Sequence, residues 1–180
     1  MMQGDNQQSI QFNLTPLKQN HQDLFCALYG DAQVMEFIGA RMSRDAVVAY
    51  FKRLLSKLSQ ADSNVLYRVI EVIAEHDGHQ MAGIVRLKKD HKNHELIIGV
   101  MLLPTFQGCG LAYQAQKQLM TAIELNDPGQ VFTAYCHINN KRAHRLYQRL
   151  GFRQIRELIY NQQPAIQWQR DMKCRKSKAV

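Results

Sequence analysis

Apolar positions along this chain follow two different spacings, which predicts a fold of helices and strands. Apolar residues at helical spacing predict helices at about 20–30, 43–58, 110–126 and 140–150. Alternating or continuous apolar runs predict strands at about 10–14, 66–75, 81–87, 96–103, 130–138, 152–160 and 165–172. Capping residues agree with these bounds: Asn20, Ser43 and Asn140 or Asn139 at helix starts, Gly30 and Gly151 at helix ends.

The composition of one strand-to-helix connection suits the binding of an anion. The apolar strand that ends at Pro104 leads into Gln107-Gly108-Cys109-Gly110, which opens the third helix. A helix N-terminus presents unpaired N–H groups and a positive dipole to an anion, and glycines allow backbone to approach it closely. The turn therefore fits a phosphate group, although glycine for turn geometry alone explains it equally well. It lacks the lysine of a P-loop and the third glycine of a dinucleotide fingerprint.

Length and composition indicate one globular unit. With 180 residues, 46% of them hydrophobic, we expect residues 1–180 to form a single domain with flexible tails at 1–8 and 173–180. No apolar run is long enough to cross a membrane and the first residues lack a signal-peptide core, so we expect a cytoplasmic protein. The scattered cysteines indicate neither a disulfide framework nor a metal site, and Cys109 is either a reactive thiol or a turn filler.

The positive charge is concentrated in the last quarter of the chain. From Asn139 onward the chain has eleven Lys and Arg and two acidic residues, a charge of +9. The preceding part carries −1, which gives the net charge of +8. This quarter is either a surface for an acidic ligand or nucleic acid, or a solvated helix face with a basic tail. Lys141, Arg142 and Arg145 start a predicted helix, where a phosphate contact and a solvated face are both reasonable.

Two segments together resemble the GNAT N-acetyltransferases. QGCGLA at 107–112 matches that superfamily's acetyl-CoA-binding pattern, and NKRAHRLYQRLGF at 140–152 matches its later NxxAxxLYxxLGF motif. The segment DAQVMEFI at 31–38 is similar to the DPEVMRFL stretch of one branch, the ribosomal-protein alanine N-acetyltransferases and their relatives. The resemblance extends from about Phe12 to Met172.

This resemblance implies an α+β, three-layer fold with a central, mixed and mostly antiparallel sheet. About seven strands are expected, with a V-shaped splay between the fourth and fifth, and about four flanking helices. In such proteins the pantetheine arm of acetyl-CoA inserts between the splayed strands, here 99–103 and 132–137. The cofactor contacts that the resemblance implies are Met101, Leu102, Leu103 and Asn140 for pantetheine, Arg142 for phosphate, and the backbone N–H groups of Gln107, Gly108, Cys109, Gly110, Leu111 and Ala112 for pyrophosphate.

The implied activity is transfer of an acetyl group from acetyl-CoA to a primary amine, without a metal. The amine of a small molecule, an amino acid or a protein N-terminus attacks the thioester directly, and the CoA thiolate leaves. A backbone N–H around Met101 or Leu103 would stabilise the developing oxyanion. Tyr147 occupies the motif position of the general acid, and is otherwise a core aromatic.

The general base is the weakest part of the resemblance. Relatives carry a glutamate where this chain has Ile97, and another branch carries one where this chain has Tyr135. Glu95 and His137 remain as candidate bases, with Glu71 as a further option; each is otherwise an ordinary surface or capping residue. A water relay without a dedicated base fits equally well.

A second interpretation is a protein that has the same fold but does not catalyse acetyl transfer. The absent strand glutamate and the basic quarter favour a non-catalytic acyl-CoA-binding or nucleic-acid-associated module, and Tyr147 and the complete turn argue against it. Nucleic acid and membrane are not expected partners, and a homodimer is compatible with the sequence. The acceptor pocket is expected between the first two helices, the connection 37–44 and the final hairpin at 161–164.

Overall fold

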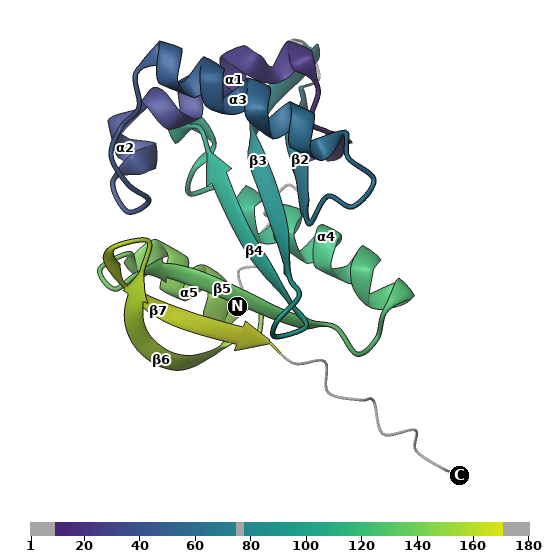
Figure 1. Ribbon diagram of the computed structural model, residues 1–180, viewed down its shortest axis with the longest axis vertical. Coiled ribbons are helices and arrows are strands. Elements are labelled where there is room, and N and C mark those ends of the chain that lie inside the picture. Colours follow the sequence, from purple (N-terminus) through teal and green to yellow (C-terminus); the bar gives the residue numbers. More distant parts are fainter. Residues whose placement is uncertain (1–9, 75–77, 171–180) are drawn as a thin grey trace, which may run out of the picture.

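The computed structural model describes residues 10–74 and 78–170, and the expected tails lie outside these ranges. Seven strands form one sheet in the order β1-β2-β3-β4-β5-β7-β6 (Figure 1). The strands are β1 (Phe12–Pro16), β2 (Val65–Ala74), β3 (Gly78–Asp90), β4 (Glu95–Leu102), β5 (Val131–His137), β6 (Arg153–Tyr160) and β7 (Gln163–Arg170). Among the described strands only the β4–β5 pair is parallel, so the sheet is mixed and mostly antiparallel, which confirms the expected fold class.

Helices cover both faces of the sheet and complete three layers. The helices are α1 (Gln22–Gly30), α2 (Ala32–Met35), α3 (Arg44–Leu58), α4 (Leu111–Asn126) and α5 (Lys141–Arg149), with short 3-10 turns at Gln19–His21 and Pro104–Phe106. α1 and α3 lie across β2 and β3 on one face, and α4 lies on the other (Figure 1). The sequence therefore located every helix of more than one turn.

Side chains of the central strands alternate between two apolar cores. Ile84 packs with Phe25 and Phe51 beneath α1 and α3, whereas the next residue, Val85, packs with Leu111 of α4. This alternation is the period-two consequence of an extended backbone. It also assigns each polar residue of β3 and β4 to one face or the other.

β4 and β5 pair over a short stretch and then separate. The parallel register joins Glu95, Leu96 and Ile97 to Val131, Phe132 and Thr133. From there the strands diverge, as Figure 1 shows, so the expected splay is present. The wedge is shorter on β5 than predicted, because Phe132 and Thr133 belong to the paired part.

Local capping explains where the helices begin. The Ser43 side chain accepts a hydrogen bond from Ala46 N at 3.3 Å, and that of Asn140 accepts from Ala143 N at 3.0 Å, as predicted. The prediction for Asn20 is wrong: it lies inside the 3-10 turn, and His21 Nδ1 accepts the N–H of Lys18 at 3.0 Å. α2 was not predicted, because four residues are too few to show a helical period.

Candidate active site

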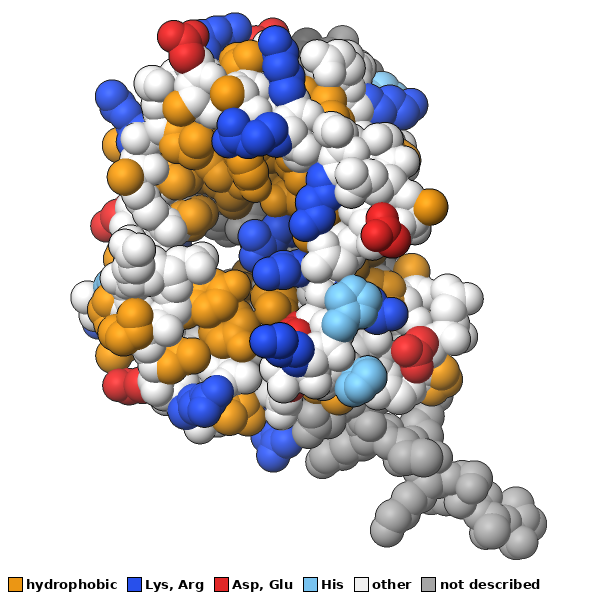
Figure 2. All heavy atoms as spheres, viewed as in Figure 1, with side chains coloured by type: hydrophobic (Ala, Val, Ile, Leu, Met, Phe, Trp, Pro, Cys, Tyr) orange, Lys and Arg blue, Asp and Glu red, His pale blue; other side chains and the backbone are white. Residues whose placement is uncertain are grey.

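A cleft of about 1110 Å³ opens at the splay between β4 and β5. Its walls come from β3, β4, β5, α2, the start of α4, α5 and the β6–β7 hairpin. Figure 2 shows this hollow crossing one face of the molecule, with apolar side chains above and below it and Lys and Arg side chains along it. Segments distant in sequence thus share one continuous space.

The glycine-rich turn forms one end of the cleft. Gly108 and Gly110 have φ values of 83° and 82°, in the left-handed region that side chains with a Cβ adopt only at a cost. Gly110 is the N-cap of α4 and has no side-chain cap. Among the described residues, the N–H groups of 108–113 donate to no acceptor. The turn therefore presents a set of free donors at the positive end of a helix dipole.

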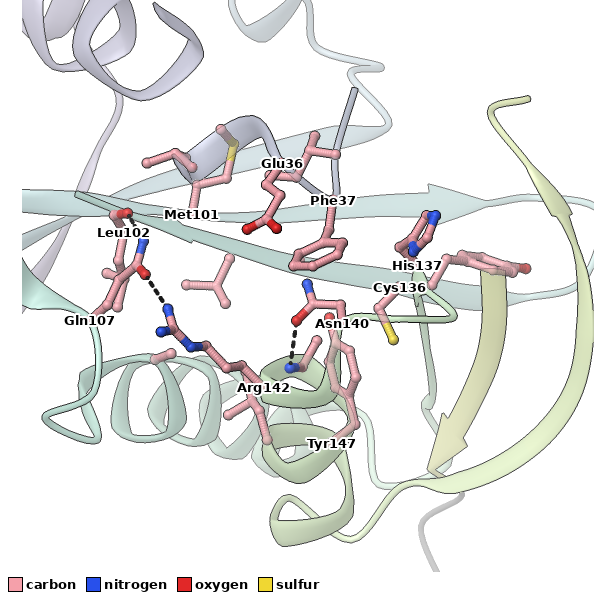
Figure 3. A pocket seen from close by; sticks show the side chains of 18 of the residues that line it. Glu36, Phe37, Met101, Leu102, Gln107, Cys136, His137, Asn140, Arg142 and Tyr147 are labelled. Atoms are coloured by element: carbon pink, nitrogen blue, oxygen red, sulfur yellow. Dashed lines mark hydrogen bonds between the residues drawn. The ribbon is translucent and has the colours of Figure 1, made fainter. Parts of the chain in front are cut away.

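Gln107 connects this turn to α5 across the cleft. Its Nε2 donates to the carbonyl oxygen of Leu102 at 3.1 Å, and its Oε1 accepts from Arg142 Nη1 at 3.0 Å (Figure 3). The guanidinium of Arg142 is thereby held over the cleft, although this first turn of α5 is exposed. A cation and a helix N-terminus thus face the same space.

Tyr147 lies on the inner side of α5 and lines the cleft. Only 4% of the residue is exposed, and its ring packs against Phe152 and Trp168, with centroid distances of 5.4 Å and 6.2 Å. In Figure 3 its hydroxyl points into the cleft beside Cys136. Burial raises the pKa of Tyr147, and the nearby Cys136 thiol raises that pKa further. The phenol consequently stays protonated at neutral pH.

Most of the predicted site residues line the cleft. Those that do are Met101, Leu102, Gln107, Gly108, Gly110, Leu111, Ala112, His137, Asn140, Arg142 and Tyr147. The Cys109 side chain turns away, and its Sγ lies 3.0 Å from the carbonyl oxygen of Phe106, as expected of a turn filler. Leu103 packs against the core beneath α1 and α3.

Neither candidate glutamate faces the cleft. Glu95 lies where β4 and β5 are paired, and its carboxylate accepts hydrogen bonds from Thr133 Oγ1 at 2.6 Å and Gln169 Nε2 at 2.8 Å. Glu71 accepts from Thr15 Oγ1 at 2.6 Å, near His21. Cross-strand partners therefore hold the carboxylate of Glu95, a candidate base, within the sheet.

His137 lines the cleft, but its ring is already engaged. The Nδ1 atom accepts the backbone N–H of Asn139 at 3.1 Å, which places the proton of a neutral ring on Nε2. Taking up a second proton would therefore break this bond. The ring also packs against Phe37, with 5.5 Å between centroids. His137 is thus better placed to shape the turn before α5 than to accept a proton.

The strand hydrogen bonds decide which backbone donors face the splay. Leu103 N donates to the carbonyl oxygen of Ala82 at 2.9 Å, so this group is committed to β3. N–H groups alternate between the two edges of a strand, so Met101 also faces β3 and Leu102 faces the splay. Of the N–H groups around Met101 and Leu103, the one that faces the splay is therefore that of Leu102.

The cleft also contains residues to which the sequence analysis gave no role in the site. Glu36 and Phe37 follow α2 and point into the cleft (Figure 3). Arg86 projects from β3, and Tyr29, Tyr67, Tyr135 and Tyr160 line the space around it. Tyr135 and Tyr160 stack with their centroids 4.1 Å apart. Apart from the neighbours Glu36 and Phe37, these residues come from different elements, so only the fold shows that they form a group.

The family is decided by the sequence comparison. The model of the acetyltransferase (GNAT) domain matches residues 11–153, which is most of the chain. The chain belongs to the GNAT acetyltransferase family. This confirms the predicted superfamily and enzyme class. No curated protein sequence matches this GNAT chain.

Solved structures similar to this GNAT protein share its fold at low sequence identity. RimL, a ribosomal L7/L12 alpha-N-protein acetyltransferase in complex with coenzyme A, is 17% identical over 91% of this chain and 95% of its own, with a TM-score of 0.73. Spermidine N-acetyltransferase from Vibrio cholerae, in complex with CoA and spermine, is 16% identical over 90% and 96%, with a TM-score of 0.74. A domain from Methanocaldococcus jannaschii is 13% identical over 91% of this chain and 99% of its own, with a TM-score of 0.73.

Two further observations concern what this GNAT domain could bind. Within residues 10–74 and 78–170, no group of His, Cys, Asp and Glu side chains is arranged to hold a metal ion. No helix in the same ranges is long and apolar enough to cross a membrane. The cytoplasmic location stays a prediction, and the oligomeric state stays open.

Proposed function

We propose that this GNAT protein transfers an acetyl group from acetyl-CoA to a primary amine inside the cleft. The observation that carries the proposal is the free row of N–H groups at the start of α4, which opens into the same cleft as the Tyr147 hydroxyl. We call the turn 107–112 with Asn140, Arg142 and Tyr147 the donor half. The acceptor half consists of Glu36, Phe37, Tyr67, Arg86 and Tyr160.

The donor half has the parts that a CoA thioester needs. The turn N–H groups and Arg142 match a pyrophosphate in charge and donor number. The facing edges of β4 and β5 offer backbone groups to the amides of a pantetheine arm, among them those of Val100 on one side. Asn140 caps α5 with its side chain and sits at the edge of the same space.

Bound acetyl-CoA supplies an acetyl group activated as a thioester, and the residues of the chain supply protons and orientation. The Leu102 N–H faces the splay and is the proposed donor to the carbonyl oxygen that gains negative charge. The Tyr147 hydroxyl is protonated at neutral pH, as an ordinary phenol is, and burial raises its pKa further. It is the proposed donor to the departing sulfur. The amine loses its own proton on the opposite side.

Glu36 is the proposed acceptor of that proton. It is the only carboxylate among the described residues that line the cleft. It is exposed at the end of α2 and points inward, so a charged amine would reach it before entering the splay (Figure 3). A carboxylate there both attracts an ammonium group and takes its proton, directly or through water. His137 lacks a free lone pair for this task.

Thiol release from acetyl-CoA with a panel of amines and N-terminal peptides tests the proposal. We expect release with at least one acceptor, and Tyr147→Phe to lower kcat about 100-fold while the Kd of acetyl-CoA stays within about threefold. Binding of acetyl-CoA without release by any amine would favour the non-catalytic acyl-CoA-binding module. No binding at all would remove both functions.

A paired substitution tests the base. Glu36→Gln is expected to lower kcat/KM by about 10- to 100-fold, because a neutral amide cannot accept the proton. His137→Gln is the matched control: it keeps an acceptor for the Asn139 N–H and is expected to change kcat/KM by less than about threefold. The reverse ranking would assign the base to His137.

A further inference from the structure

Arg86 stands in the cleft on the sheet face that is opposite α4. On β3 it lies between Val85 and Leu87, which both pack into the core with α4. Its neighbours across the ladder are Tyr67 on β2 and Gly99 on β4. Tyr67 belongs to the core beneath α1 and α3, so the guanidinium projects to that side. The turn at the start of α4 and the first turn of α5 are on the other face.

No carboxylate neutralises Arg86. The ion pairs between described residues join His21 to Glu71, Arg44 to Asp23 and Arg170 to Glu124, and none includes Arg86. The groups around its side chain are the phenols of Tyr67, Tyr160 and Tyr29. Burial works to lower the pKa of Arg86, but these hydroxyl groups outweigh it and the pKa is raised. A guanidinium keeps its charge and its five donors in any case.

The space beside Arg86 is open. Gly99 is its cross-strand neighbour, and a Cβ built on Gly99 would have no atom within 4 Å. Both residues line the cleft. A half-buried cation therefore borders a void that a small group can fill from the acceptor half. Leaving such a cation without an anion is costly, and a ligand carboxylate would match its planar fork with two hydrogen bonds.

The phosphates of CoA do not account for this cation. Lys141, Arg142, Arg145 and Arg149 of α5 already line the cleft near the glycine-rich turn. Arg86 lies on another strand and on the opposite face of the sheet from that turn. Its charge also repels polyamines, which carry several cationic groups and would have to pass it.

We propose that Arg86 binds a carboxylate of the acceptor, so that the substrate is an amine that also carries a carboxylate, such as an amino acid or an acidic peptide. This assignment rests on the proposed acetyl transfer. Glu36 would face the ammonium group while Arg86 holds the carboxylate, and the two charges would orient the amine toward the splay. The acceptor half would then be specific for a zwitterion rather than for a polycation.

The test compares matched acceptors in a thiol-release assay: amino acids and acidic peptides, the same compounds as carboxamides, amines that carry a phosphate, and spermidine. We expect kcat/KM to be about 10- to 100-fold higher for a carboxylate than for its carboxamide. Arg86→Gln is expected to remove that ratio by lowering kcat/KM for the carboxylate alone. Arg86→Lys keeps the charge without the fork and should fall between. Arg53→Gln, on the exposed side of α3, controls for net charge.

The outcomes separate this assignment from the proposed function. If no amine releases thiol, acetyl transfer itself fails. If thiol is released but carboxamides, phosphate-bearing amines or spermidine serve as well as carboxylates, the carboxylate assignment is overturned and the transfer stands. A weaker Kd for acetyl-CoA in Arg86→Gln would assign Arg86 to the donor instead. Should that variant fail to fold, the wild-type preference and Arg86→Lys still decide.

Discussion

The two halves of the cleft are built in different ways. The donor half uses a continuous turn and one helix, and much of its binding capacity comes from backbone N–H groups whose direction depends on glycine conformation. The acceptor half uses single side chains from α2, β2, β3 and the β6–β7 hairpin. A backbone site tolerates little change in chain geometry, whereas a site of separate side chains can change residue by residue. The two halves should therefore respond to substitution independently.

The largest effect is expected in the β3–β4 pair, because β3 carries Arg86 of the acceptor half and β4 leads toward the turn of the donor half. A Cβ on Gly83 would overlap the carbonyl oxygen of Met101 and lie 2.9 Å from the Cα of Leu102, so β3 and β4 would have to separate. We expect Gly83→Ala to lower the free energy of unfolding by about 3 kcal/mol or more, measured by urea denaturation. Gly99→Ala, with open space at its Cβ, should cost less than about 1 kcal/mol. A loss of stability in Gly83→Ala as small as that in Gly99→Ala would show that β3 and β4 can separate at little cost.

The next effect should fall on the donor half alone. Gly110→Ala forces a left-handed conformation on a residue with a Cβ, at a cost of about 1–2 kcal/mol, and the turn is expected to relax and misdirect its N–H groups. The Kd of acetyl-CoA should rise about 10-fold by calorimetry, with the amine KM unchanged. Gly129→Ala, at a glycine without positive φ, is the control. An unchanged Kd in Gly110→Ala would separate the turn from cofactor binding.

The converse substitution should affect the acceptor half alone. Tyr160 stacks on Tyr135 with an angle of 5° between the rings, and both line the cleft. Tyr160→Ala removes this stack, and we expect the amine KM to rise about 3- to 10-fold. The Kd of acetyl-CoA should not change. A parallel loss of acetyl-CoA binding would mean that the hairpin supports both halves and that they are not independent.

The smallest effect is expected on the pH dependence of stability, through His21 at the start of α1. Burial lowers the pKa of His21 below 6.5, with Glu71 opposing and Lys18 assisting. His21 therefore binds a proton more readily in the unfolded chain than in the folded one. Its neutral form destabilises nothing above pH 6.5, and the free energy of unfolding falls as the pH drops below that value. The Tm of the wild type should decrease more between about pH 8 and about pH 5.5 than that of His21→Gln. Identical decreases would exclude His21 as a source of acid sensitivity.

The sequence predicted the parts of the site that are contiguous. Gln107 to Ala112 and the Asn140 helix stand in uninterrupted motifs, and local geometry decides what they present. The sequence could not show which N–H group around Met101 and Leu103 faces the splay, because that depends on the pairing of Leu103 with Ala82, which is remote in sequence. The hydrogen bonds that hold Glu95 in the sheet could not be predicted either, because its partners, Thr133 and Gln169, come from two other strands.

Arg86 shows why the acceptor half could not be predicted. In the sequence it is one basic residue in a strand that also contains Lys88 and Lys89, and its spacing is that of any exposed position. Only the register with Gly99 and the divergence of β5 place it beside a void. The position of Glu36 could not be predicted for a similar reason: α2 is too short for its sequence to show which way the residues after it point.

The hydrogen bond between Gln107 and Arg142 has a consequence for the entropy of ligand binding. A free arginine on an exposed helix turn samples many rotamers, and ordering such a side chain costs about 0.5–1.5 kcal/mol. Here Gln107 is anchored to Leu102 and holds the guanidinium over the cleft before any anion arrives. Folding has therefore already ordered the Arg142 side chain, and an anion that enters the cleft meets a guanidinium in a fixed position.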